Sequence, residues 1–213
     1  MFNYEEMKNK IILADCMDIM KDIPDKSIDL ILTDPPYGLG DRLTDGGHKK
    51  NPMEKYRKSY EKKRWDELPE KEYFQEMFRV SKNQIIWGGN YFIDYLKSSR
   101  CFLIWDKKQM MPTFSRCEFA WTSFDKPSKI YEKSSSDSLR FHPTQKPVEL
   151  FRWIIQNYSK PDDLIMDCFS GSGACACACY LEKRNFIAIE KDEDYYKSSV
   201  ERLETLRSQG VLF

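Results

Sequence analysis

Short apolar runs alternate along the chain with longer segments in which apolar residues recur at helical spacing. A run that is hydrophobic on both faces is typical of a parallel-sheet strand covered by helices. We predict strands at residues 10–15, 29–34, 84–88, 101–105, 118–123, 164–169 and 185–190. We predict helices at residues 17–23, 69–81, around 151–158, after Gly173 and at 192–206. The pattern predicts an α/β fold with a doubly wound, mostly parallel sheet, helices on both faces and one antiparallel edge strand at residues 118–123.

Length and charge limit the classes of protein that fit. The 213 residues are enough for one well-buried domain, and we predict a single domain over residues 1–213. Lys and Arg together number 34, as do Asp and Glu. The chain therefore has no overall charge to attract a polyanion, and nucleic-acid binding would need a local basic patch.

The cysteines and the apolar runs bear on location. Seven cysteines, an odd number spread through apolar segments, favour free thiols in a reducing cytoplasm over a disulfide framework. The start of the chain contains acids and no apolar core, unlike a secretory signal. No apolar run approaches the roughly 20 residues that cross a bilayer. We expect a cytoplasmic protein with no membrane partner.

Residues 29–38, D-L-I-L-T-D-P-P-Y-G, form a predicted strand that ends abruptly. The adjacent Pro35 and Pro36 permit neither a helix nor strand pairing, so the chain must leave the sheet as a stiff turn. Open parallel sheets bind ligands outside the carboxyl ends of their strands. A rigid turn there that carries Asp34 and Tyr37 indicates a functional site, with an ordinary proline turn as the alternative.

Residues 39–69 lack both helical and strand periodicity, and we predict a basic loop or insertion there. Between Lys49 and Arg64, eight Lys or Arg stand against two acids, with aromatic residues interleaved. Such a segment can follow a phosphate backbone and stack on bases, although a solvated charged surface is the alternative. The candidate DNA-contacting residues are Lys49, Lys50, Arg57, Lys58, Lys62, Lys63 and Arg64.

Residues 167–173, D-C-F-S-G-S-G, place a glycine turn between a predicted strand and a helix. The glycines allow a ligand to approach the backbone, and a helix N-terminus favours an anionic group. Glu190 ends the next strand, where an acid can accept both hydroxyls of a ribose. Together these features indicate a ribose-bearing cofactor, either a dinucleotide or S-adenosylmethionine.

The motif D-P-P-Y at 34–37 resembles the catalytic motif of the DNA methyltransferases that methylate exocyclic amines. D-C-F-S-G-S-G resembles their cofactor loop, and H-P-T-Q-K-P at 142–147 resembles the segment before that loop in the permuted beta class, which has this motif order. The resemblance spans residues 11–196. It implies a Rossmann-like methyltransferase sheet in which strands 29–34 and 164–169 lie side by side, S-adenosylmethionine as cofactor, and a flipped DNA base as substrate.

The resemblance also implies residue roles. Asp34, with the carbonyl near Pro35, would accept hydrogen bonds from the target amine, Pro36 would hold the loop rigid, and Tyr37 would stack on the flipped base. The implied cofactor-binding residues are Asp15 at the adenine, Glu190 at the ribose, Asp167, Phe169, Gly171, Ser172 and Gly173 around the methionine portion, and Thr144 and Lys146 near the carboxylate.

Two departures from the family pattern matter. Ala174 stands where relatives commonly have Thr, and residues 122–141 are too few for a separate target-recognition domain. Either the sequence specificity is relaxed, or residues 39–69 supply sequence recognition, or a homodimer or partner subunit helps. Cys175, Cys177 and Cys179 alternate with alanine, but on a helix Cys177 points away from the other two, so we predict close helix packing and no metal site.

The function that these features favour is site-specific transfer of a methyl group to the N6 amine of adenine in DNA, by a bacterial or phage-encoded restriction-modification type of enzyme. Adenine is preferred because Asp opens the catalytic motif, whereas Ser is commoner in relatives that methylate cytosine N4. That preference is family analogy. Cytosine-N4 methylation, a non-catalytic DNA-binding subunit that needs a partner, and methylation of RNA or of a protein glutamine remain alternatives.

Overall fold

A computed structural model describes residues 4–39, 67–109, 115–134 and 145–209. Most of the predicted 39–69 insertion, with all seven candidate DNA-contacting residues, lies outside these ranges. Thr144 and the first residues of H-P-T-Q-K-P lie outside them as well.

Eight strands form one mixed sheet in the order β1-β8-β7-β2-β3-β5-β4-β6. The strands are β1 Lys10–Leu13, β2 Ile28–Thr33, β3 Ser81–Trp87, β4 Phe102–Asp106, β5 Cys117–Thr122, β6 Lys129–Glu132, β7 Leu164–Asp167 and β8 Asn185–Glu190. The helices are α1 Tyr4–Met7, α2 Cys16–Met20, α3 Lys71–Val80, α4 Val148–Tyr158, α5 Ala174–Leu181 and α6 Glu193–Ser208, with a 3₁₀ turn, η3, at Gly89–Tyr91. The predicted α/β class is confirmed.

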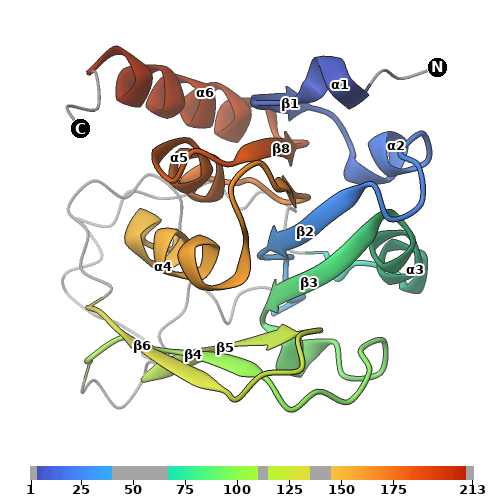
Figure 1. The fold of residues 1–213 in the computed structure, drawn as a ribbon, viewed down its shortest axis with the longest axis vertical. Helices are drawn as coiled ribbons and strands as arrows, with labels where there is room; N and C mark the ends of the chain where they lie inside the picture. The colour runs from blue at the N-terminus through green and yellow to red at the C-terminus, as the bar shows by residue number, and fades with distance from the viewer. Residues whose placement is uncertain (1–3, 40–66, 110–114, 135–144, 210–213) are drawn as a thin grey trace, which may run out of the picture.

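Helices cover the sheet in two groups (Figure 1). Helices α4, α5 and α6 lie on one side and share a buried cluster with Leu30, Ile85 and Leu103 of the sheet. Helices α2 and α3 lie on the other side and pack on Ile31, Ile86 and other inward residues of the same strands. Adjacent residues of one strand thus enter opposite cores, which explains the unbroken apolar runs in the sequence.

The antiparallel strand is not at the edge of the sheet, contrary to the prediction. β5 is antiparallel to both neighbours, β3 and β4, and lies between them. Only residues 107–116 separate β4 from β5, and a connection this short does not provide the crossover that parallel neighbours need. The edge is β6, which the sequence did not predict, since K-I-Y-E has one aliphatic residue and is mostly exposed.

The small-residue helix α5 explains the alternating cysteines. Cys175, Cys177 and Cys179 are all buried, and the helix packs between α4 and α6. Ala and Cys allow this close approach because their side chains are short. Among the described residues, no group of three or more His, Cys, Asp or Glu side chains could hold a metal ion.

β2 and β7 are parallel neighbours, with Leu30 opposite Ile165 and Ile31 opposite Met166. From β2 the chain continues to β3 on one side, and from β7 it continues to β8 on the other. This is a topological switch point, where the loops after two adjacent strands diverge and leave a crevice. The predicted adjacency of the D-P-P-Y and glycine-turn strands is confirmed.

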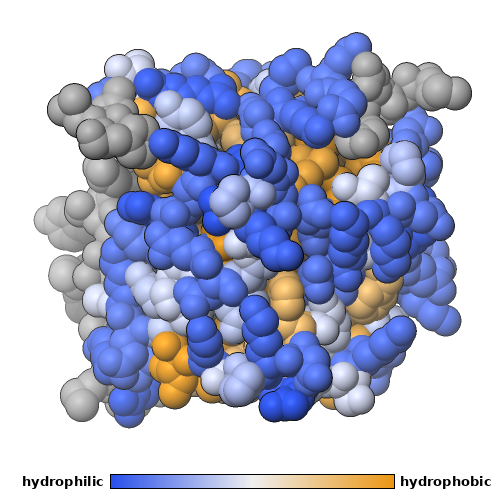
Figure 2. All heavy atoms as spheres, in the orientation of Figure 1, coloured by the Kyte–Doolittle hydropathy of each residue, from blue (hydrophilic) through white to orange (hydrophobic). Residues whose placement is uncertain are grey.

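The face of the molecule in Figure 2 is mostly hydrophilic, with only small scattered hydrophobic areas. Within the described residues, none of the helices has the length and apolar character needed to span a membrane. The surface gives no further indication of the site, which lies at the switch point.

Candidate active site

A cavity of about 700 Å³ opens at the carboxyl ends of β2, β7 and β8. It brings together most of the predicted site residues. Those that line it are Asp15, Asp34, Pro35, Pro36, Tyr37, Lys146, Asp167, Phe169, Gly171, Ser172 and Glu190. Residues from opposite ends of the chain therefore share one cavity, as the strand order requires.

Asp34 follows the end of β2, and both of its carboxylate oxygens have partners. Oδ1 accepts a 2.5 Å hydrogen bond from the Tyr37 hydroxyl, and Oδ2 accepts one from Lys146 Nζ. Burial raises the pKa of Asp34 above its ordinary value, although Lys146 opposes that shift. The D-P-P-Y turn thus folds back so that its first and last residues are bonded to each other.

Tyr37 is held by ring packing as well as by Asp34. Its ring stacks on Tyr91, with centroids 4.8 Å apart and an interplanar angle of 22°. A Cβ added to Gly88, which has a φ of 67°, would lie 2.1 Å from Tyr37 Cε1. Glycine at 88 therefore makes room for the ring, and one face of the ring is stacked on Tyr91.

Asp167 ends β7 and joins the two halves of the site. Its Oδ1 accepts hydrogen bonds from Thr33 Oγ1 at 2.8 Å and from the Phe169 amide at 3.2 Å. Burial raises the pKa of Asp167 to about 7, against the lowering effect of these donors. The carboxyl group can therefore change charge near neutral pH.

Glu190 ends β8 and braces the glycine turn. Its Oε2 accepts from the Gly171 amide at 2.7 Å, and its Oε1 accepts from the Asp192 amide at 2.8 Å. Each carboxylate oxygen has a second lone pair, so both can also accept from a ribose diol. Burial raises the pKa of Glu190 above its ordinary value.

Three predicted cofactor residues have further or different roles. Asp15 lines the cavity but also caps α2, because its side chain accepts from the Met17 amide at 2.8 Å; the helix accordingly begins at Cys16, one residue before the prediction. Gly173 is not among the cavity-lining residues. With a φ of 70°, it lies at the start of α5, where an added Cβ would come 3.0 Å from Ser199 Cβ on α6.

Lys146 is the third of these residues. We expected it near the cofactor carboxylate, but its Nζ contacts Asp34, the Tyr37 hydroxyl at 3.2 Å and Glu118 Oε2 at 3.2 Å. Glu118 was not among the site residues predicted from the sequence. The one signal was an acidic residue within the otherwise apolar strand C-E-F-A-W-T.

The cavity fits S-adenosylmethionine. It contains carboxylates at the ends of three strands, the aromatic ring of Phe169 and the amides of a glycine turn. Ser170 Oγ, beside the turn, is buried without a hydrogen-bond partner among the described residues, so it is available to a polar ligand. The donors and acceptors suit a ligand with a ribose and an amino-acid portion.

Residues 104–201 match the N6/N4 family of DNA methylases. The chain is a DNA methyltransferase that is similar, over this part of its length, to the N6/N4 family. The match covers the antiparallel strands, the β7 glycine turn and Glu190, but not Asp34, which precedes it.

Relatives of this methyltransferase cover nearly its whole length. It is 27% identical over 96% of the chain to the Type II methyltransferase M.HinfI of Haemophilus influenzae, and covers 71% of that protein. It is 29% identical over 94% of the chain to the Type II methyltransferase M2.MboI of Moraxella bovis, and covers 89% of that protein.

Solved structures share the fold. The M1.HpyAVI–SAM complex has a TM-score of 0.61 at 24% identity, covering 91% of this chain and 99% of that one. The PvuII DNA methyltransferase, which is cytosine-N4-specific, has a TM-score of 0.61 at 15% identity, covering 94% of this chain and 91% of that one. The first of these neighbours was solved with SAM bound, and SAM is a ligand that the cavity of this chain fits.

Proposed function

We propose that the chain is a beta-class methyltransferase that acts on the N6 amine of adenine at specific sites in DNA. The observation that supports this most is the shared cavity, in which Asp34 and Tyr37 face the glycine turn and Glu190. The order of the motifs along the chain supports the permuted class, and the Type II relatives support site-specific action. The seven free cysteines support action in the cytoplasm.

Asp34 is the residue that prepares the amine in this proposal. An exocyclic amine is a weak nucleophile because its lone pair is delocalised into the ring. By accepting hydrogen bonds from the N–H groups, Asp34 and the carbonyl near Pro35 direct that lone pair at the methyl group. Pro36 limits the movement of the turn, and Tyr37 provides the aromatic surface for the flipped base.

S-adenosylmethionine supplies an electrophilic methyl group on its sulfonium. Glu190 and Asp15 would hold its ribose and adenine, while Asp167, Phe169, Gly171 and Ser172 would surround its methionine portion. Gly173 would act indirectly, by allowing α5 to pack on α6. Thr144 remains a proposed contact to the cofactor carboxylate.

The predicted DNA-binding role of residues 39–69 also remains a proposal. Leu68 and Pro69, at the described end of this segment, line the cavity. A basic segment that leaves the catalytic loop and returns to the cavity rim is well placed to follow a phosphate backbone. A second subunit would be an additional source of DNA contacts.

Transfer of tritiated methyl groups to unmethylated bacterial DNA, followed by nucleoside analysis, tests the proposal. We expect N6-methyladenine. N4-methylcytosine as the sole product would overturn the adenine assignment, and the fold does not decide this point because a cytosine-N4-specific enzyme shares it. Transfer only to RNA or to protein would overturn the choice of DNA.

A further inference from the structure

Lys146 lies between two carboxylates that come from different strands. Its Nζ pairs with Asp34 on one side and with Glu118 Oε2, at 3.2 Å, on the other. The Lys146 side chain is only 2% exposed, so its positive charge is stabilised by these two carboxylates rather than by water. Its ammonium also lies 5.2 Å from the centroid of the Trp87 ring, on the strand between the two carboxylates' strands.

Glu118 is held from its other side. Its Oε1 pairs with Lys107 Nζ at 2.5 Å, so the two acids and two lysines form a chain with no net charge. Glu118 is not among the residues that line the cavity, whereas Lys146 and Asp34 are. Glu118 thus contacts Lys146 but does not line the cavity in which the substrate would bind.

The two bonds that occupy Asp34 must rearrange when an amine arrives. Tyr37 donates to Oδ1 and Lys146 donates to Oδ2, so both oxygens that the amine could use already accept a hydrogen bond. Each oxygen has a second lone pair, but a third donor crowds the group. Lys146 already has a second anionic partner within hydrogen-bond range, so it can shift toward Glu118 without leaving its charge unpaired.

We propose that Lys146 and Glu118 are positioning residues for methyl transfer: Lys146 keeps Asp34 ionised and oriented, and Glu118 receives the lysine when the target amine binds Asp34. This inference rests on the proposed role of Asp34. It assigns a function to a buried ion pair that the cofactor cavity and the base do not explain.

The electrostatics of the cluster agree with this division. Burial acts to lower the pKa of Lys146, but Asp34 and Glu118 outweigh it, so that its pKa is raised. Burial acts to raise the pKa of Glu118, but Lys146 and Lys107 outweigh it, so that its pKa is lowered. The cluster thus lowers the pKa of Glu118 and raises the pKa of Asp34.

The charged and titratable groups that face Asp34 predict opposite effects of two substitutions. Lys146 and Tyr37 donate to it, Glu118 is a nearby negative charge, and Asp167 lies across the switch point. Loss of Lys146 should raise the pKa of Asp34 further, because an attractive charge is removed. Loss of the Glu118 charge should lower it, because a repulsive charge is removed.

The test measures kcat/KM for methylation of unmethylated plasmid DNA against pH, using the full chain with S-adenosylmethionine. Asp34 must be ionised to accept the amine, so activity should fall as pH drops through its pKa. For Lys146→Gln we expect a kcat about 10²-fold lower. We also expect the acid limb of the pH–activity profile, where activity falls as pH drops, to move to higher pH. For Glu118→Gln we expect an acid limb moved to lower pH, while Lys146→Arg keeps it near the wild-type position.

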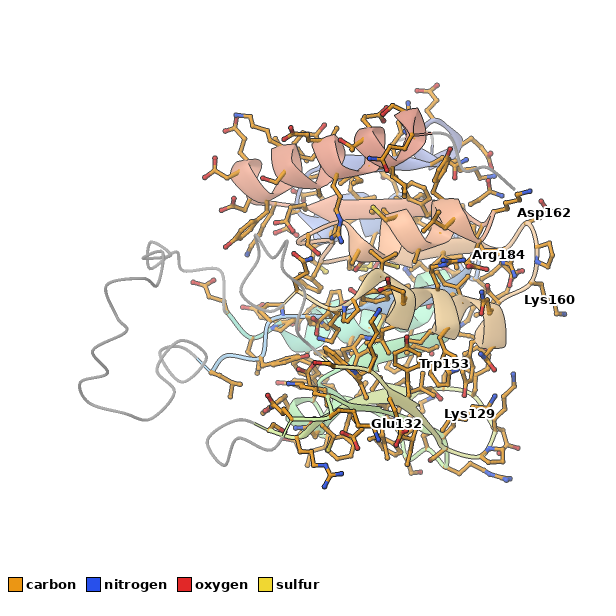
Figure 3. The ribbon with its side chains drawn as sticks, turned by 90° about the vertical axis from the view of Figure 1, so that its left-hand side faces the viewer. Lys129, Glu132, Trp153, Lys160, Asp162 and Arg184 are labelled. Carbon is orange, nitrogen blue, oxygen red and sulfur yellow. The ribbon has the colours of Figure 1, made fainter. Side chains whose placement is uncertain are left out.

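The matched control is Glu132→Gln, which removes a glutamate of β6 that pairs with Lys108 at 2.5 Å. Glu132 lies at the edge of the sheet, below α4 in Figure 3, and should leave the profile unchanged. Acid limbs that stay in place, or that move in the same direction in both variants, would overturn the proposal. If Lys146→Gln does not fold, Lys146→Arg and Glu118→Gln still provide the comparison.

The failure of this inference differs from the failure of the proposed function. If the wild-type chain does not methylate DNA, or if Asp34→Ala still does, both proposals are wrong. A different result would concern the positioning role alone. In that case the wild-type chain methylates DNA and Asp34→Ala does not, but the acid limbs of the Lys146→Gln and Glu118→Gln profiles do not move apart. Only the positioning role of Lys146 and Glu118 is then wrong.

Discussion

The two halves of the cavity are built in different ways. On the cofactor side, Glu190 accepts from two backbone amides, and Asp167 accepts from one backbone amide and from the buried Thr33 hydroxyl, so the carboxylates are fixed to the chain that surrounds them. On the catalytic side, Asp34 is held by the side chains of Tyr37 and Lys146. Backbone contacts keep a binding site in one shape, whereas side-chain contacts can exchange when a substrate arrives.

The largest expected effect is on the catalytic side. Asp34→Ala removes the acceptor for the amine and should lower methyl transfer to DNA by roughly 10³-fold or more. The affinity for S-adenosylmethionine should change little, since the backbone-braced carboxylates remain in place. Radiolabel transfer and isothermal titration calorimetry measure the two effects. An equal loss of transfer and of cofactor binding would contradict the separation of the two halves.

Two glycines with the same left-handed backbone offer a matched comparison. Gly88→Ala would push a Cβ into the Tyr37 ring, and Gly173→Ala would push one to within 3.0 Å of Ser199 Cβ. We expect Gly88→Ala to lower kcat by about 10-fold or more, because it moves the catalytic tyrosine. Gly173→Ala should mainly cost stability, by about 1–2 kcal/mol in urea unfolding. The reverse assignment of the two effects would contradict the model of the site.

Replacement of the ribose acceptor should act on binding alone. Glu190→Gln removes the negative charge at the end of β8 and replaces one of the two acceptor oxygens by an NH2 donor, so it should weaken binding of S-adenosylmethionine by about 10-fold. The kcat at saturating cofactor should change by less than about 3-fold. A large fall in kcat at saturation would instead place Glu190 in the catalytic half.

Asp167 should make the free energy of unfolding depend on pH. Its pKa is raised to about 7, so the folded chain binds a proton there that the unfolded chain has released above its ordinary pKa. The free energy of unfolding should therefore fall as pH rises toward 7, and the loss should be complete above it. Asp167→Asn should flatten this slope in urea titrations between about pH 4 and pH 8. A slope that is the same in the variant would show that another group is responsible.

The strand-end carboxylates could be predicted from the sequence, because a carboxylate after an apolar run is a local pattern. Asp34, Asp167 and Glu190 all follow or end strands that line one cavity. The adjacency of β2 and β7 followed from family resemblance, and the register confirms it.

Glu118 and the edge strand β6 could not be predicted in this way. Glu118 reaches Lys146 only because β5 runs antiparallel between β3 and β4, which no local pattern specifies. β6 pairs with β4 through its backbone and buries little apolar surface, so it leaves no hydrophobic run in the sequence. Long-range pairing and ion pairs between distant segments depend on the assembled sheet.

The central claim is that Asp34 directs methylation of adenine N6 at specific sites in DNA. The most direct measurement is to map modified bases across the genome of otherwise methylation-free bacterial cells that express this chain alone or its Asp34→Ala variant. The account predicts N6-methyladenine in one recurring sequence context with the wild-type chain and none with the variant. N4-methylcytosine alone, or methylation that persists in the variant, would contradict it.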